Sequence, residues 1–275
     1  MGMLDGKEAH ITGGSRGQGR SHALTLAREG ADIIAVDICQ QASTVPYPMS
    51  TPDDLAETVK EVEALDRRII AAQADVRDLA RLTEVVNEAV AELGRLDIVL
   101  ANAGISAPAP TLEMDELVWN EMIDINLTGQ WKTIRAAVPH VIAGGRGGAV
   151  VITSSLAAIY ANENTAHYSA AKAGLVMLMK VLAKELAPHS IRVNTVHPTT
   201  VATDMILNEP TYRLFRPDLE NPTRADFEVA ARTLNKLPVA ALEPGDISNA
   251  ILYLVSDAGR YVTGITHVVD AGGQL

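Results

Sequence analysis

The chain has 275 residues, of which 47% are hydrophobic and 21% charged, a balance that is typical of globular proteins and sufficient for one large α/β domain. Its formal net charge of −11 disfavours nucleic acid or an anionic membrane surface as the main partner, because both would repel it. The single cysteine excludes an intrachain disulfide and paired-cysteine zinc motifs, and no segment reads as a secretion signal or membrane span, so we expect a cytoplasmic protein without a metal site.

Seven short runs rich in Ile and Val predict buried strands, and segments with helical spacing lie between them. The strands are expected at residues 9–12, 32–37, 68–75, 97–104, 149–155, 192–198 and 266–273. The clearest helical segments are 18–29, 79–93, 117–143 and 168–187. Strict alternation predicts a Rossmann-type doubly wound α/β fold, in which a mainly parallel seven-stranded sheet carries helices on both faces. Nothing marks a second domain, so we expect residues 1–275 to form one oxidoreductase domain.

Two connections are longer than the usual loops of such a fold. The first, residues 39–53, contains several prolines and small polar residues and lies just after the second expected strand; we call it the insertion. The second, residues 204–238, follows the sixth expected strand and contains many large side chains; we call it the lid segment. Long loops in compact domains often cover active sites, so we expect the insertion near a cofactor and the lid segment over a substrate, with Met205 and Leu207 in contact with it.

The segment between the first and second strands has the composition of a phosphate-binding turn. Gly13, Gly17 and Gly19 follow the first strand and open a helix, whose amino terminus offers free N–H groups and a positive dipole to a pyrophosphate. Asp37 ends the second strand, where its carboxylate can accept hydrogen bonds from an adenosine ribose and repel a 2′-phosphate. NAD is therefore favoured over NADP. Arg16 leaves the alternative open, because a loop arginine can serve a 2′-phosphate.

The stretch YSAAK places Tyr168 and Lys172 one helical turn apart on the same side of a helix. A nearby ammonium favours phenolate, so we expect the pKa of Tyr168 to fall from its usual value of about 10. Tyr168 then is a candidate general base for an alcohol, and the general acid in reverse. Ser155, at the end of the fifth strand, can hydrogen-bond the same substrate oxygen. The alternatives for the tyrosine and the lysine are a packing residue and a solvated charge.

The segments TGGSRGQG, ANAG, Asn126, SS and YSAAK occur in an order that resembles the short-chain dehydrogenase/reductase family over nearly the whole chain. The resemblance implies a catalytic tetrad of Asn126, Ser155, Tyr168 and Lys172. Ser155 is chosen over its neighbour because the family's serine precedes the tyrosine by thirteen residues. Asn126 is implied to hold a water that connects Lys172 to solvent.

The family pattern and the local sequence together predict the NAD site. Asp75 and Val76 follow the third strand and could fix the adenine, although Asp75 could also cap the next helix. Pro198 and Thr203 match the family's segment near the nicotinamide, and Thr199 stands where the family commonly has glycine. His197 is a candidate for the same pocket. The expected cofactor contacts are Gly13, Arg16, Gly17, Gln18, Gly19, Asp37, Ile38, Asp75, Val76, Asn102, Ala103, Gly104, Tyr168, Lys172, Pro198, Thr199, Val201 and Thr203.

A closer resemblance rests on ICQQ with its proline-rich continuation and on VHPTTVATDMI, which are similar to the carveol-dehydrogenase-like subgroup associated with the redox cofactor mycofactocin. It implies a hydrophobic secondary alcohol, such as a terpenoid, bound by Ser155, Tyr168, Met205 and Leu207. It also implies a tightly held NAD that mycofactocin recycles in place, and the family implies a homo-oligomer, a tetramer. Two alternatives stay open: an ordinary dehydrogenase with exchangeable NAD and another alcohol, and a noncatalytic NAD-binding regulator.

Overall fold

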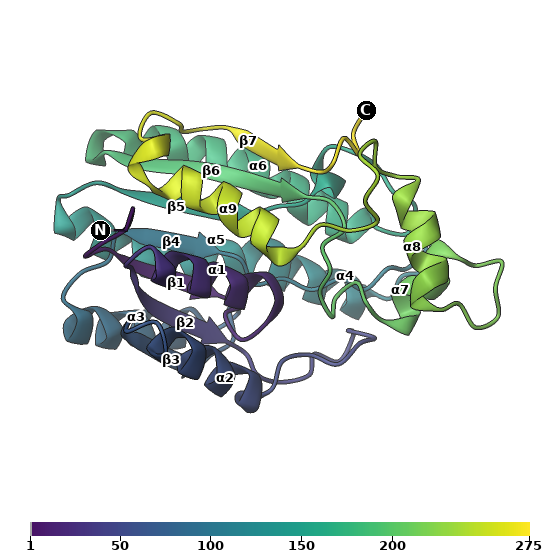
Figure 1. Ribbon diagram of the computed structural model, residues 1–275, viewed down its shortest axis with the longest axis horizontal. Coiled ribbons are helices and arrows are strands. Elements are labelled where there is room, and N and C mark those ends of the chain that lie inside the picture. Colours follow the sequence, from purple (N-terminus) through teal and green to yellow (C-terminus); the bar gives the residue numbers. More distant parts are fainter. Residues whose placement is uncertain (1) are drawn as a thin grey trace.

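The computed structural model describes residues 2–275, which fold around one seven-stranded sheet (Figure 1). The strand order is β3-β2-β1-β4-β5-β6-β7, and every neighbouring pair is parallel. The order reverses between β1 and β4, which is where ligands bind in doubly wound sheets. The strands are β1 Glu8–Thr12, β2 Asp32–Asp37, β3 Ile69–Gln73, β4 Ile98–Ala101, β5 Gly148–Thr153, β6 Ile191–Pro198 and β7 Thr266–Val269.

Helices cover both faces of the sheet (Figure 1). Helices α1, α2 and α9 lie on one face, and α3, α5 and α6 lie on the other. The α-helices are α1 Gly17–Arg28, α2 Pro52–Glu63, α3 Leu79–Leu93, α4 Glu116–Ile123, α5 Gln130–Gly144, α6 Ala166–Leu186, α7 Glu209–Phe215, α8 Arg224–Arg232 and α9 Pro244–Val255. Within residues 2–275, none of the helices is long and apolar enough to cross a membrane.

Two apolar cores hold these layers together. Leu26 of α1, Leu55 of α2 and Ile247 of α9 pack against one face of the sheet. Leu82 of α3 and Leu175 of α6 pack against the other face. Both faces are buried, which explains why the strands read as nearly continuous apolar runs in the sequence. The predicted fold class is therefore confirmed, and all seven strands lie where the sequence places them.

The helix expected at 117–143 contains an interruption. Between α4 and α5, residues Asp124–Gly129 form one turn of π-helix, which inserts an extra residue into the helical ladder. A Cβ on Gly129 would lie 2.6 Å from Cγ2 of Val76, so glycine lets this turn pass close to the end of β3. Turns of this kind are often found at functional sites, and this one carries Asn126.

The lid segment is more regular than the sequence prediction of a long loop. It contains α7 and α8, and it extends with the insertion beyond the carboxyl ends of the strands (Figure 1). Asn208 caps α7 by accepting from the N–H of Thr211. Thr223 and Asp226 form a reciprocal capping box at the start of α8. The prediction of irregular structure here missed these two capping signals.

Candidate active site

A cavity of about 830 Å³ opens at the carboxyl ends of the strands. This volume lies at the upper end of the range for small-molecule sites, about 300–1,000 Å³. All of the expected cofactor contacts line it, as do Ser155 and Met205. Asn126 and Leu207 are not among the lining residues. The topology therefore brings into one cavity residues that are far apart in the chain, from Gly13 to Leu275.

The glycine turn fits a pyrophosphate because its backbone is tight and open. Gly13 and Gly17 have φ angles of +71° and +55°, a conformation that side chains with a Cβ rarely adopt. A Cβ on Gly19 would overlap the carbonyl oxygen of Gly13. Asn102 supports the turn from β4, since its amide donates to the carbonyl of Thr12 at 3.0 Å. The amino terminus of α1 thus lies at the cavity, with glycine at the first and third helical positions.

Asp37 is held in place but keeps capacity for a ligand. Its Oδ2 accepts from the N–H of Ser15 at 3.0 Å, and its Oδ1 accepts from the hydroxyl of Ser50 at 2.6 Å and the N–H of Cys39 at 3.3 Å. A carboxylate has about four acceptor sites, so one is left for a ribose hydroxyl. Ser50 belongs to the insertion and lines the cavity, and sequence reasoning did not single it out.

Asp75 lies at the cavity but is already paired. The guanidinium of Arg77 donates to Oδ2 of Asp75 at 2.8 and 2.7 Å and to Oδ1 at 3.1 Å, and it also donates to Glu121 at 2.9 Å. The cap of α3 is Asp78, which accepts from the N–H of Arg81. The alternative role of Asp75 as a helix cap is therefore wrong, and its contact with adenine stays a prediction.

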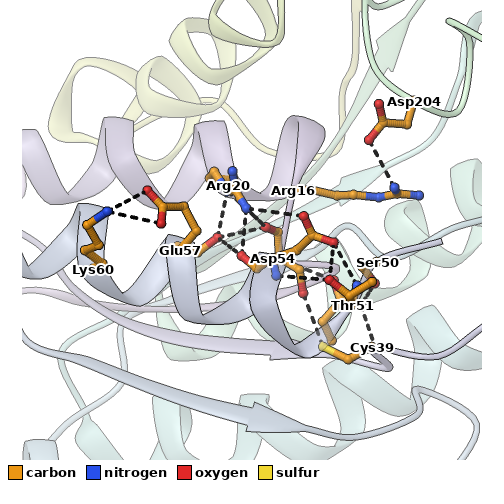
Figure 2. A network of polar contacts seen from close by, with 12 residues as sticks. Arg16, Arg20, Cys39, Ser50, Thr51, Asp54, Glu57, Lys60 and Asp204 are labelled. Atoms are coloured by element: carbon orange, nitrogen blue, oxygen red, sulfur yellow. Dashed lines mark hydrogen bonds and ion pairs between the residues drawn. The ribbon is translucent and has the colours of Figure 1, made fainter. Parts of the chain in front are cut away.

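Arg16 is committed to two neighbours rather than free for a phosphate. Its Nη1 donates to Asp204 at 3.0 Å (Figure 2). Its Nη2 donates to the carbonyl oxygen of Pro48 at 2.6 Å. A carboxylate next to this guanidinium would also repel a 2′-phosphate. The geometry therefore weakens the alternative in which Arg16 selects NADP.

The two serines after β5 have different partners. The hydroxyl of Ser154 donates to the carbonyl of Lys172 at 2.9 Å, which ties the strand to α6. The hydroxyl of Ser155 accepts from the N–H of Ala157 at 3.1 Å and also hydrogen-bonds Tyr168. Behind it, Nδ1 of His197 lies 2.9 Å from the carbonyl oxygen of Ser155. His197 is fully buried and is not among the residues that line the cavity, so its candidate role in the nicotinamide pocket is wrong. It supports Ser155 from the side away from the cavity.

Tyr168 and Lys172 face the same side of α6, but their charges do not interact as the spacing predicts. Burial raises the pKa of the Tyr168 phenol above its usual value, and the hydrogen bond with Ser155 offsets only part of this. Burial lowers the pKa of Lys172 to about 8. Its ammonium donates to the carbonyl of Thr153 at 2.8 Å and lies 5.5 Å from the centre of the Tyr168 ring. The expected lowering of the tyrosine pKa is wrong here, because burial raises the pKa by more than the hydrogen bond with Ser155 lowers it.

Asn126 lies beneath the cavity floor. Its side chain accepts from the N–H of Ile105 and donates to the carbonyl of the same residue, each at 2.8 Å. A Cβ on Gly104 would lie 3.0 Å from Oδ1 of Asn126 and 3.5 Å from Nζ of Lys172. Asn126 is therefore close to Lys172, and its side-chain amide hydrogen-bonds the backbone of the segment after β4. Its predicted link to a water stays a prediction.

The wall beyond Ser155 and Tyr168 is mainly apolar and comes from the lid segment. Met205 lines it as expected, whereas Leu207 does not, because the turn at Thr203 directs Ile206 to the cavity instead.

Tyr47 of the insertion also lines the cavity. It was not singled out from the sequence, although it is the one aromatic residue of that insertion. Its hydroxyl accepts from the N–H of Ser106, and burial raises its pKa to about 12. The remaining apolar lining includes Leu156, Leu214, Phe215 and Leu234.

A glycine turn at the start of a helix, an acid at the end of β2, and a serine, a tyrosine and a lysine line one cavity. This combination is typical of a dinucleotide-dependent oxidoreductase. Among residues 2–275, no three His, Cys, Asp or Glu side chains are grouped so that they could hold a metal ion. The short-chain dehydrogenase family model matches residues 7–211. The chain belongs to the short-chain dehydrogenase family, and the predicted enzyme class, an oxidoreductase acting on CH–OH groups, is confirmed with it.

Similar proteins agree with this membership over the full length. The chain is 55% identical to (−)-trans-carveol dehydrogenase of Rhodococcus erythropolis over 276 aligned positions, covering 100% of both chains. Its structure matches carveol dehydrogenase from Mycobacterium avium in complex with NAD, with a TM-score of 0.98, 54% identity and coverage of 100% and 99%. It also matches a short-chain dehydrogenase from Mycobacterium paratuberculosis bound to NAD, with a TM-score of 0.90, 43% identity and 99% coverage of both.

Proposed function

We propose that this protein uses NAD to interconvert a hydrophobic secondary alcohol, such as carveol or another terpenoid, and its ketone. The observation that carries the proposal is the junction of two surfaces in one cavity. Ser155, Tyr168 and Lys172 form a polar floor, and the side chains of the lid segment form an apolar wall above it. A substrate that places one hydroxyl on the floor and its carbon skeleton against the wall fits both. The two NAD-bound structural neighbours and the carveol dehydrogenase relative support the same assignment.

The residues of the floor divide the acid–base work. The hydroxyl of Ser155 holds the substrate oxygen beside Tyr168, which exchanges the proton with it. Bound NAD supplies the hydride acceptor. Lys172 sits in the tetrad with its ammonium fixed by Thr153, and it keeps a positive charge beneath the tyrosine at neutral pH. Asp37, the glycine turn and Asn102 would hold the dinucleotide so that the reacting carbon faces Ser155.

The raised pKa of Tyr168 predicts how the rate depends on pH. A phenol that keeps its proton at neutral pH is ready to protonate a ketone, whereas alcohol oxidation needs the phenolate. We expect kcat/KM for oxidation to rise with pH and kcat/KM for reduction to fall. Steady-state kinetics in both directions between pH 6 and 10 would measure this. A pH-independent oxidation rate across that range would contradict the role of Tyr168.

Replacing Tyr168 tests the catalytic assignment. Tyr168→Phe removes the hydroxyl and keeps the ring, so we expect turnover to fall by about 10²- to 10⁴-fold while nucleotide binding is retained. Activity is measured with a panel of terpenoid alcohols, using both NAD and an artificial electron acceptor. Tyr160→Phe is the matched control, because that tyrosine lies in the same cavity outside the tetrad. Equal turnover in the wild type and in the Tyr168→Phe, Lys172→Ala double variant would favour the noncatalytic regulator.

The insertion supports the finer proposal that NAD is held in place and recycled by mycofactocin. Ser50 and Tyr47 come from the insertion, and both line the cavity beside the residues expected to bind the cofactor. Mass spectrometry of protein purified without added nucleotide tests this, and retained NAD is the expected result. Absence of NAD, together with steady turnover on added NAD, would favour the ordinary dehydrogenase with exchangeable cofactor.

Exposed apolar side chains support the proposal of a homo-oligomer, a tetramer. Leu117 and Trp119 of α4, Trp131 of α5, and Met177 and Val181 of α6 are all exposed in the single chain. Large apolar groups gathered on helices that are close in the fold are typical of subunit interfaces. Light scattering coupled to size exclusion would give the mass in solution, and a monomer would contradict the proposal. The cytoplasm stays the expected compartment.

A further inference from the structure

Three chain segments that are far apart in the sequence meet at Arg16. The arginine belongs to the glycine turn, Pro48 to the insertion and Asp204 to the lid segment. One guanidinium donates to both partners through different nitrogens, so it bridges the insertion and the lid segment across the cavity. Figure 2 shows its contact with Asp204. All of these segments line the cavity.

Further contacts fix the insertion to the same edge of the cavity. Ser50, two residues after Pro48, donates to Asp37 at 2.6 Å. Beneath the polar contacts, Met49 of the insertion and Met205 of the lid segment pack against the same apolar core. The insertion is thus held by several contacts, which include those of Ser50 and Tyr47. Asp204, in contrast, is the one ionic contact that ties the lid segment to the glycine turn within the described chain. The side chain of Arg16 is 23% exposed and that of Asp204 is 64% exposed, so solvent reaches this ion pair mainly from the side of the lid segment.

We propose that Arg16 is a positioning residue that controls how fast the dinucleotide leaves, by joining the insertion and the lid segment over the cavity. This rests on the proposed function in one respect, namely that the cavity binds NAD. A nucleotide beneath both covers can leave only after at least one of them moves away from Arg16. The bridge therefore sets a barrier to release, in addition to any contact between Arg16 and the nucleotide itself.

The two partners of Arg16 should contribute unequally. The ion pair with Asp204 is partly exposed, so it is weak and screened by salt. The hydrogen bond to Pro48 has a charged donor and a backbone acceptor, and it belongs to the stronger kind. We expect Asp204→Asn to speed NAD release by about 2- to 5-fold. Arg16→Gln removes the charge and both contacts, and we expect it to speed NAD release by about 10-fold.

The experiment measures release of labelled NAD from the loaded wild-type protein and from each variant, after dilution into unlabelled NAD. Arg213→Gln is the matched control. It removes one positive charge, as Arg16→Gln does, and it lies in the lid segment, as Asp204 does. Arg213 contacts Glu209 and Asn221 of that segment and neither partner of the bridge. Its release rate should equal that of the wild type. Raising the salt concentration should speed release from the wild type and have less effect on Asp204→Asn.

A double-variant cycle separates the bridge from direct binding. If Arg16 acts through Asp204, then Asp204→Asn has no further effect once Arg16→Gln is present. Additive effects of the two substitutions would overturn the bridge, and so would wild-type release rates in both single variants or faster release from Arg213→Gln. Should Arg16→Gln fail to fold, Asp204→Asn and its salt dependence decide the matter. Release is measured without turnover, so a failure of the proposed alcohol chemistry would leave these rates interpretable.

Discussion

The carboxyl and amino ends of the same sheet both bury ionisable groups, but they do so with different partners. At the carboxyl end, Lys172 is 3% exposed and has a backbone carbonyl as its hydrogen-bond acceptor, with no ion pair within the described residues. At the amino end, Asp97 accepts two charged hydrogen bonds from Arg95, each at 2.7 Å, and another from the N–H of Glu8.

The difference teaches which buried charges serve the fold and which serve the site. A buried charge without a partner lowers stability, and it persists only where something else is gained. Lys172 is next to Tyr168 and Ser155 of the cavity floor, so the stability that its burial costs is offset by a role in catalysis. The carboxylate of Asp97 is matched by Arg95 and Arg146, and it joins β1 to the turn before β4. Removing the unmatched charge of Lys172 and removing the matched charge of Asp97 should therefore have opposite effects on stability.

Removing the buried ammonium should have the largest effect. Lys172→Met keeps much of the side-chain volume, and we expect turnover to fall by about 10²-fold or more while the free energy of unfolding rises by about 1–3 kcal/mol. The pKa of Lys172 falls from 10.5 to about 8 on folding, so the penalty is fully present below pH 8 and disappears above pH 10.5. The rise in the free energy of unfolding of Lys172→Met should therefore be largest below pH 8 and should disappear above pH 10.5.

Urea unfolding of nucleotide-free protein at several pH values measures this gain. Lys180→Met, an exposed lysine on the same helix, is the control and should change neither quantity. A loss of stability in Lys172→Met below pH 8 would contradict the comparison, because it would mean that the contact with Thr153 outweighs the cost of desolvation.

Breaking the matched charge at the amino end should have the next largest effect, in the opposite direction. Asp97→Asn removes the ion pair with Arg95 and leaves the guanidinium without its carboxylate. Because Arg95 is 34% exposed while Asp97 is 7% exposed, we expect a loss of about 2 kcal/mol instead of the full cost of a buried pair. Turnover per folded molecule should stay unchanged. A change below about 0.5 kcal/mol in urea unfolding would show that water replaces the lost contact.

The sequence predicts most of the fold and much of the cavity for a physical reason. Buried parallel strands leave continuous apolar runs, and glycine turns or a tyrosine and lysine one helical turn apart leave local patterns. The π-helical turn at Asn126 leaves no such pattern, because it depends on how close Gly129 comes to Val76. The direction of a pKa shift is equally non-local: spacing places Lys172 beside Tyr168, but burial by the rest of the chain decides the sign.

The contacts made by loops are also set by tertiary structure. Ser50 and Pro48 lie in a segment whose composition predicts irregular structure, and their partners Asp37 and Arg16 are more than ten residues away. Leu207 and Ile206 are equivalent apolar residues in the sequence, and only the turn at Thr203 decides that Ile206 lines the cavity. A sequence can therefore indicate that a loop covers a site while leaving open which residues do so.

Glu8 gives the smallest and most specific test, because it is the member of the amino-end cluster whose charge is poorly matched. Its side chain is 3% exposed, with Oε1 3.7 Å from Arg68, while Oε2 has no hydrogen-bond partner. Burial, with contributions from Asp97 and Asp32, raises its pKa from 4.5 to about 7, against the opposing effect of Arg68. The folded state thus holds a proton that the unfolded state has lost between pH 4.5 and 7, so stability falls as pH rises through that window.

Glu8→Gln removes the charge and keeps the shape, so we expect it to raise the free energy of unfolding by about 1 kcal/mol at pH 8. The gain should shrink as the pH falls through 7 and vanish near 4.5, where the wild-type carboxyl is neutral in both states. Glu92→Gln is a control for the general loss of one negative charge, since Glu92 is exposed near the end of α3, which leads to the amino end of β4. If Glu8→Gln instead destabilised the protein at pH 8, the ion pair with Arg68 would be worth more than the buried charge costs, and Glu8 would belong with Asp97 among the matched charges.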